Sequence, residues 1–295
     1  MVDRSGLHRA PRRAGTNRLA VVRRALSGYL YRHSVLVDEL PEQRRPNALA
    51  QIESGTCSDA PSEELCLLSY NIQRGERSAR AADSLRAAVE AHRPHVILLQ
   101  EAPVEFFREG ASAELLAGRH LFFAPFHQVD RPERRYPYRL YGQLTASTCP
   151  LRNHHVIELP TVNPSTLGPA HTLKRIALYA EMEAADGRAV GLVNVHNEPF
   201  ARGRDRRLQH EAFLEVVEQR APDVAVCCGD FNPTFSQRGE PGIRLLEDAG
   251  FANAFAHRRR TLDTCLARGH AGYLGALRLP LAGSDHRPIV VRLRL

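Results

Sequence analysis

From residue 65 to the end of the chain, short runs of strand-forming residues alternate with amphipathic helical segments, and this alternation constrains the fold most. Leu65–Tyr70 and His95–Gln100 have the composition of buried strands, and the helical period of Ser78–His92 lies between them. Further along, Arg175–Glu183 and Ala189–Val195 predict a hairpin. Hairpins beside strand–helix–strand units predict an α/β (α+β) protein with sheets of mixed direction, rather than a doubly wound parallel sheet.

The other predicted elements complete this order, and we expect Gly142–Ser147 and His155–Leu159 to pair with each other around Pro150. The remaining strands are predicted at Leu121–Phe126, Asp223–Cys228, Thr261–Ala267 and Pro288–Leu295, and the remaining helices at Ala113–Gly118, Arg206–Gln219 and Ile243–Ala249.

The positive charge of the chain is concentrated in its first fifty residues. The formal net charge is +7, but residues 1–50 contain ten arginines against four acidic residues, which leaves residues 51–295 near neutrality. An excess of basic over acidic residues favours a nucleic-acid partner, but here the excess is confined to the N-terminal segment. No apolar run approaches the ~20 residues of a membrane span.

The six cysteines form no CxxC pair and no zinc-ligand spacing. We therefore expect reduced thiols and a cytoplasmic protein. The alternative is targeting to an organelle, because residues 4–32 are rich in arginine and lack acidic residues, as transit peptides do.

Polar side chains follow five of the predicted strands at the point where each strand ends or begins. These segments are Tyr70-Asn71-Ile72-Gln73, Leu99-Gln100-Glu101, Asn194-Val195-His196-Asn197, Gly229-Asp230-Phe231-Asn232 and Ser284-Asp285-His286-Arg287-Pro288. Strand ends that face one rim of a sheet are where α/β proteins build their sites. Taken together, the five segments predict a site for metal and phosphate chemistry.

The order of these segments resembles the endonuclease/exonuclease/phosphatase superfamily, the deoxyribonuclease I-like metal-dependent phosphoesterases. The resemblance covers about residues 64–295 and implies a four-layer sandwich of two mixed β-sheets flanked by helices. The resemblance makes 64–295 the catalytic domain and leaves the residues before it unexplained. From composition and spacing, we expect a disordered basic tail at 1–17 and a helical extension and linker at 18–63. The extension is predicted to contain a helix at 18–33 and a short helical turn near Ala48–Ile52.

The resemblance implies Mg²⁺ as the cofactor, with Mn²⁺ as the alternative. Hard cations prefer oxygen ligands and keep several waters, so one or two carboxylates suffice. Glu101 is the first candidate ligand, with the amide oxygen of Asn71 beside it and Asp285 as the third member.

The remaining candidates are proton carriers and phosphate contacts. Asp230 is expected to hold and deprotonate the attacking water, and Asn232 to hydrogen-bond the phosphoryl oxygens. His196 and His286 are expected to donate to the phosphate, with Asp263 orienting His286. Two supporting residues near the phosphate, Gln73 and Arg175, complete the predicted site.

The resemblance implies a divalent-metal-dependent phosphoester hydrolase, with nucleic acid as the first candidate substrate. The basic N-terminal segment and the loop Arg131–Tyr141, where arginine and tyrosine alternate, suit phosphate contact and base stacking. The alternatives are a phosphatase or phosphodiesterase of phosphoinositides, sphingolipids or small phosphoesters, and a catalytically inactive binding module on the same fold. We expect a monomer without a transmembrane segment.

Overall fold

The computed structural model of the protein describes residues 50–75, 78–128, 138, 140–161, 175–199, 201–233, 237–258 and 261–295. The predicted tail at 1–17, the predicted helix at 18–33 and nearly all of the loop Arg131–Tyr141 lie outside these residues.

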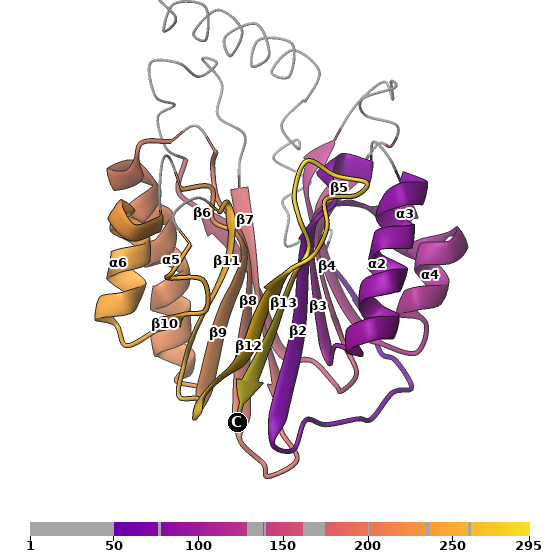
Figure 1. The fold of residues 1–295 in the computed structure, drawn as a ribbon, viewed down its shortest axis with the longest axis horizontal. Coiled ribbons are helices and arrows are strands. Elements are labelled where there is room, and N and C mark those ends of the chain that lie inside the picture. Colours follow the sequence, from indigo (N-terminus) through magenta and orange to yellow (C-terminus); the bar gives the residue numbers. More distant parts are fainter. Residues whose placement is uncertain are drawn as a thin grey trace, which may run out of the picture.

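Two β-sheets pack face to face and are flanked by helices on both outer sides (Figure 1), which confirms the predicted four-layer sandwich. The seven-stranded sheet has the order β1-β4-β5-β3-β2-β13-β12. Its strands are β1 (Gln51–Glu53), β2 (Glu64–Asn71), β3 (Val96–Pro103), β4 (His120–Gln128), β5 (Leu140–Ser147), β12 (Gly272–Arg278) and β13 (Ile289–Arg294).

The six-stranded sheet has the order β10-β11-β9-β8-β7-β6. Its strands are β6 (Arg152–Leu159), β7 (Arg175–Glu183), β8 (Ala189–His196), β9 (Val224–Asp230), β10 (Ala252–Asn253) and β11 (Asp263–Arg268). The predicted hairpin of β7 and β8 is confirmed by their antiparallel register.

Three helices cover the outer face of the seven-stranded sheet, and two cover that of the six-stranded sheet (Figure 1). The first group is α2 (Ser78–His92), α3 (Val104–Arg108) and α4 (Gly110–Leu116), and the second is α5 (Gly203–Arg220) and α6 (Pro241–Asp248). Two short 3-10 turns, η3 (Gln73–Gly75) and η4 (Gln237–Gly239), complete the described elements. None of the helices within the described residues is both long and apolar enough to cross a membrane.

Strand β2 shows how the alternation of residues builds the layers. Leu65 and Leu67 point into the core between the two sheets, whereas Cys66 and Leu68 point into the core under α2. Successive side chains of a strand face opposite sides, so a strand covered on both faces must be apolar throughout. This explains why the strand runs of this sequence lack polar alternation.

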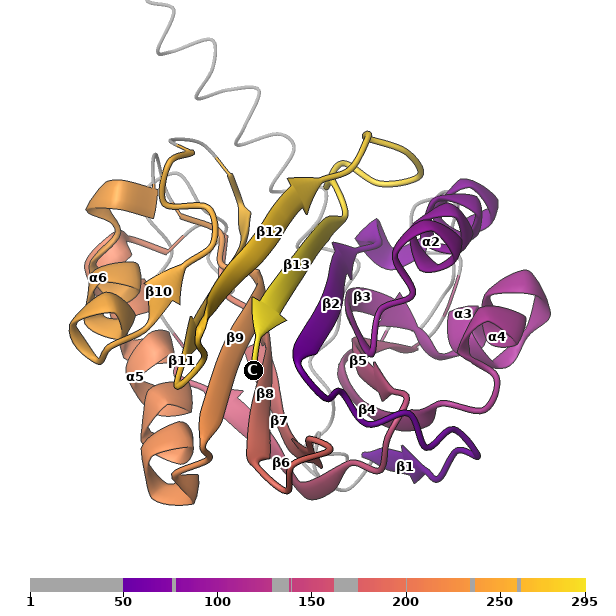
Figure 2. The same ribbon diagram turned by 60° about the horizontal axis from the view of Figure 1, so that its bottom comes forward.

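Two expectations for the fold are wrong, and one edge strand was not predicted. Residues 51–53 form an edge strand that pairs with β4, not part of a helical turn. Strands β5 and β6 do not pair, because the chain passes from one sheet to the other at Pro150 and β6 pairs with β7 instead. Strand β12 was not predicted: its glycines and half-exposed residues interrupt the strand pattern, and it lies at the edge of its sheet beside β13 (Figure 2).

The topology brings four strand ends to one rim of the sandwich. Among the described strands, only β2–β3 and β8–β9 are parallel pairs, one in each sheet. The two strands of a parallel pair end at the same edge of a sheet. The ends of β2, β3, β8 and β9 therefore meet at the rim opposite the C-terminus (Figure 1).

Candidate active site

All of the residues predicted for the site lie at this rim and are linked by contacts of 3.9 Å or less. The strand ends supply Asn71, Glu101, His196 and Asp230, and Asp263 begins β11 directly opposite Asp230. The contacts show which of these groups act on one another.

The Asp230 carboxylate is the centre of the site. It is 1% exposed, and its Oδ2 accepts a hydrogen bond of 3.0 Å from the side-chain amide of Asn71. The Nε2 atoms of His196 and His286 each lie 3.7 Å from the same oxygen. Burial is the main cause that raises the pKa of Asp230 to about 7, and the charges of Asp263 and Glu101 add to the effect. A carboxylate with such a pKa suits proton abstraction near neutral pH.

The segment around Asp230 explains why glycine precedes the aspartate. Gly229 has φ +148°, and a Cβ atom at this position would lie 2.1 Å from the backbone oxygen of Val195 on β8. Only glycine allows the two parallel strands to approach this closely. After the aspartate, Asn232 has φ +48°, and its N–H donates to Asp230 Oδ1 at 3.1 Å. The Asn232 side chain donates to the backbone oxygen of Asn197, so it is held by the protein.

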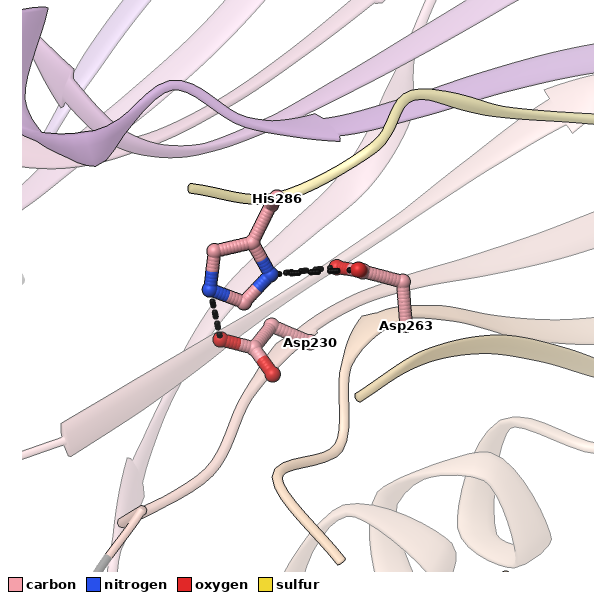
Figure 3. A group of neighbouring side chains, drawn as sticks. All are labelled: Asp230, Asp263 and His286. Atoms are coloured by element: carbon pink, nitrogen blue, oxygen red, sulfur yellow. Dashed lines mark hydrogen bonds and ion pairs between the residues drawn. The ribbon is translucent and has the colours of Figure 1, made fainter. Parts of the chain in front are cut away.

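His286 and Asp263 form a hydrogen-bonded pair (Figure 3). His286 Nδ1 lies 3.1 Å from both carboxylate oxygens of Asp263, and Nε2 points toward Asp230. Burial alone lowers the pKa of His286, but the charges of Asp263, Asp230 and Asp285 outweigh it and raise this pKa well above its usual value. The imidazole is therefore held in the charged form, with one N–H on Asp263 and the other directed into the site.

The loop that carries His286 is held in place by hydrogen bonds of two polar side chains. Ser284 Oγ donates to the backbone oxygen of Asn71 at 2.6 Å, and Gln73 Oε1 accepts from the Asp285 N–H at 3.1 Å. Gly283 (φ +74°) lies against the first turn of α2, where a Cβ atom would be 2.3 Å from a backbone nitrogen. The Gln73 side chain thus holds the loop, while the Asp285 carboxylate is 55% exposed.

Glu101 projects from an irregular point of β3. The β3–β5 register shifts between Leu99 and Ala102, and Glu101 has φ +53°, which is uncommon for a residue with a side chain. Its carboxylate lies 3.6 Å from His196 Nε2 and 3.8 Å from Arg74 Nε. The bulge therefore aims the carboxylate into the site.

Arg175 is buried behind His196. It is 7% exposed, and its Nε donates to the buried carboxylate of Glu198 at 3.1 Å. Its Nη1 lies 3.1 and 3.4 Å from the two ring nitrogens of His196, so it lies over the ring face rather than in the ring plane. Neither Glu198 nor Arg74 was predicted for the site.

The oxygen donors at the rim fit a divalent cation. Glu101 and Asp285 supply carboxylates that are not fully buried, and the Asn71 amide oxygen lies on the strand beside β3. This donor set matches the preference of Mg²⁺ for a few carboxylate and amide oxygens. Atoms of Asp230, Asp263 and His286 also lie within 4.8 Å of one another, as a metal centre would require. The His286–Asp263 hydrogen bond, however, uses atoms that such a centre would need.

A second buried network supports the site from α5. His210 is 0% exposed; its Nδ1 donates to the backbone oxygen of Arg206 at 3.0 Å and its Nε2 accepts from Asn197 Nδ2 at 3.1 Å. These two partners require the neutral imidazole with the proton on Nδ1. Burial is the main cause that lowers the pKa of His210 to about 4, and the charge of Arg206 lowers it further.

His210 should therefore make the stability of the protein depend on pH. An unfolded histidine binds a proton below its pKa of ~6.5, whereas the folded one stays neutral down to about pH 4. Above pH 6.5 this difference in proton binding costs no stability. As the pH falls from 6.5 to 4, it lowers the free energy of unfolding by about 3 kcal/mol. We expect urea unfolding of His210→Gln to show a shallower loss of stability across this window than the unsubstituted protein. Equal slopes for the two proteins would contradict this role.

The two-sheet sandwich with flanking helices has the deoxyribonuclease I-like fold, and at one rim of it the buried Asp230 lies between two histidines. The chain belongs to the Endonuclease/Exonuclease/phosphatase family, whose model matches residues 68–286. Members of this family are phosphoesterases and generally use a divalent metal.

The chain is also similar to individual proteins. The chain is 31% identical over 137 residues to UPF0294 protein VV2535 of Vibrio vulnificus (strain YJ016), covering 44% of this chain and 48% of that protein. It thus spans about half the length of the curated relatives it matches. The endonuclease/exonuclease/phosphatase from Beutenbergia cavernae DSM 12333 has a similar structure, with a TM-score of 0.59, 20% identity, and coverage of 79% of this chain and 72% of that one. The structure of mannosyl-6-phosphatase Bt3783 of Bacteroides thetaiotaomicron VPI-5482 is also similar, with a TM-score of 0.59 and 16% identity. The match covers 78% of this chain and 100% of that one.

Proposed function

We propose that the protein hydrolyses phosphoester bonds with the help of a divalent metal ion, Mg²⁺ or Mn²⁺. The observation that carries this proposal is the Asp230 carboxylate, which is held 3.7 Å from two imidazoles, one of them backed by Asp263. This arrangement provides a proton acceptor and, in His286, a charged donor within one buried site.

In the proposed reaction, Asp230 accepts the proton of the attacking water, because its pKa lies near neutrality and the Asn71 amide and the Asn232 N–H hold its two oxygens. The charged His286 donates a hydrogen bond from Nε2 to a phosphoryl oxygen and stabilises the negative charge that develops there. His196 is positioned to donate from the other side of Asp230.

The metal would be held by Glu101, Asn71 and Asp285. When bound, it supplies positive charge that neutralises a phosphoryl oxygen and favours departure of the leaving group. The buried Arg175 would act through His196, and Gln73 through the Asp285 loop, rather than by direct substrate contact.

Nucleic acid is the first candidate substrate. Residues 4–45 are rich in arginine, and arginine and tyrosine alternate in 131–141. The latter loop enters β5 next to the end of β3, since Tyr141 pairs with Pro103, two residues after Glu101. The near-neutral charge of residues 51–295 favours the second candidate, a small phosphoester or a phosphorylated lipid.

A panel of substrates tests the proposal. The full chain should turn over at least one of plasmid DNA, abasic duplex, bis-p-nitrophenyl phosphate, p-nitrophenyl phosphate and phosphoinositide when Mg²⁺ or Mn²⁺ is added. Asp230→Asn should lower kcat by ~10²- to 10⁴-fold, because the proton acceptor is lost. His155→Ala, at an exposed histidine of β6, should leave the rate unchanged.

Two results would contradict the proposal. Hydrolysis that persists in Asp230→Asn would show that this site does not carry out the reaction. Absence of turnover for every substrate, with the metals added, would favour the binding module.

A further inference from the structure

Two buried amide side chains meet between the sheets directly below the site. Gln100 of β3 and Asn194 of β8 are both 0% exposed. Gln100 Nε2 donates to Asn194 Oδ1 at 2.7 Å and also lies 3.2 Å from Ser69 Oγ. The strands of this pair belong to different sheets, so the hydrogen bond joins the two halves of the sandwich.

Asn194 also binds the backbone where β3 becomes irregular. Its Nδ2 donates to the backbone oxygens of Leu99 at 3.1 Å and Leu144 at 2.9 Å. These two residues are opposite each other in the last regular pair of the β3–β5 ladder before the register shift. An amide group from the opposite sheet thus satisfies backbone acceptors on both strands of the pair that directly precedes the bulge carrying Glu101.

The pair is adjacent in sequence to two groups of the site. Gln100 immediately precedes Glu101, and Asn194 lies two residues before His196. Residues two apart on a strand point to the same face, so Asn194 and His196 both project toward the seven-stranded sheet. Glu101 Oε1 and His196 Nε2, which are 3.6 Å apart, therefore lie on two strands that are joined by a hydrogen bond directly below them.

We propose that Gln100 and Asn194 are a positioning pair, which fixes the bulge in β3 and thereby the direction of the Glu101 carboxylate toward the metal. This inference rests on the proposed function, because it assigns Glu101 to the metal. Outer groups that orient metal ligands typically contribute 10- to 100-fold to metal affinity. A purely structural role would instead lower stability and leave the affinity of the folded protein unchanged.

Gln143 offers a matched control. Like Gln100, it is 0% exposed, donates from Nε2 to an acceptor of the opposite sheet, here the Ile176 backbone oxygen, and has a buried Oε1 without a hydrogen-bond partner among the described residues. Gln143 lies opposite the bulge, between Leu144 and Gly142 of β5, but its described hydrogen bond does not involve Gln100 or Asn194, so it tests whether loss of any buried amide beside the bulge has the same effect. Replacing either glutamine by methionine removes the amide while keeping the side-chain volume similar.

The experiment measures Mn²⁺ affinity by electron paramagnetic resonance together with urea unfolding. Gln100→Met and Asn194→Leu should raise the Kd for Mn²⁺ by ~10- to 100-fold, whereas Gln143→Met should change Kd less than twofold despite a similar loss of stability. If Asn194→Leu does not fold, Gln100→Met, which keeps the Asn194 bonds to the backbone, decides the question.

Two outcomes would overturn the inference. One is an unchanged Kd in folded Gln100→Met, and the other is an equal rise of Kd in Gln143→Met. Both presuppose that the unsubstituted protein binds Mn²⁺ and is active. If the unsubstituted protein neither binds Mn²⁺ nor hydrolyses any substrate of the panel, the proposed function itself fails. If the unsubstituted protein binds Mn²⁺ and is active, but one of the two outcomes above is found, only the positioning role of Gln100 and Asn194 fails.

Discussion

Replacing Asp263 by asparagine should lower kcat by roughly 10²- to 10⁴-fold while changing KM little. The carboxylate lies 3.1 Å from His286 Nδ1 and is a main cause of the raised pKa of that histidine. An asparagine can hold the ring by its amide oxygen or its amide nitrogen, but it cannot stabilise the charge. The histidine would then lose its charged form, which is the stronger donor to the phosphoryl oxygen. Steady-state kinetics on the substrate identified by the panel measure this effect.

Asp223→Asn is the matched control for this substitution. Asp223 directly precedes β9 and accepts a hydrogen bond from the N–H of Ala189, at the end of the sheet away from the site. The same carboxylate-to-amide change should leave kcat within twofold. A comparable fall of kcat in both variants, or no fall in Asp263→Asn, would show that Asp263 does not act through His286.

Local patterns predicted the elements better than their partners. The helix Ser78–His92 has the predicted bounds, because its period and the following Arg93-Pro94 define both ends. The pairing of β5 with β6 was wrong because a short connection with proline is compatible with a hairpin and with a passage between sheets. Sequence periodicity contains no information on which sheet a buried strand joins.

The site could be predicted because its side chains interrupt apolar runs at strand ends, where the polar residue is conspicuous. The supporting residues were not predicted, although some left a signal. Gln100 and Asn194 are polar residues inside apolar strands, and burial of such groups is costly unless they are hydrogen-bonded. That cost indicates a partner but does not identify it, because the partner belongs to the opposite sheet.

The buried arginine of α5 was predicted only as the first residue of an amphipathic helix. Arg206 is 0% exposed and would be expected on the outer face by composition alone. Its acceptors include three backbone oxygens of the loop after β8, five to eight residues before it, and the Glu240 carboxylate, 34 residues after it, in the segment before α6. Only the fold could show that this cation belongs to the interior.

Substituting Arg206 by methionine should therefore destabilise the protein by about 3–5 kcal/mol, because it removes one partner of a buried ion pair. The guanidinium donates to Glu240 Oε1 at 3.0 Å and to the backbone oxygens of Glu198 at 3.0 Å and Ala201 at 2.9 Å. Methionine fills much of the space but satisfies none of these acceptors. Urea unfolding measures the change.

The neighbouring Arg207 provides the control, since its side chain is 47% exposed and pairs with Glu211 on the same helix. Arg207→Met should cost only about 0.3–0.5 kcal/mol, as exposed pairs do. Adding Glu240→Gln to Arg206→Met should recover part of the lost stability, because the buried group that faced Arg206 then carries no charge. If the two arginine substitutions cost the same, or if Glu240→Gln gives no recovery, the buried ion pair does not hold the loop that follows His196.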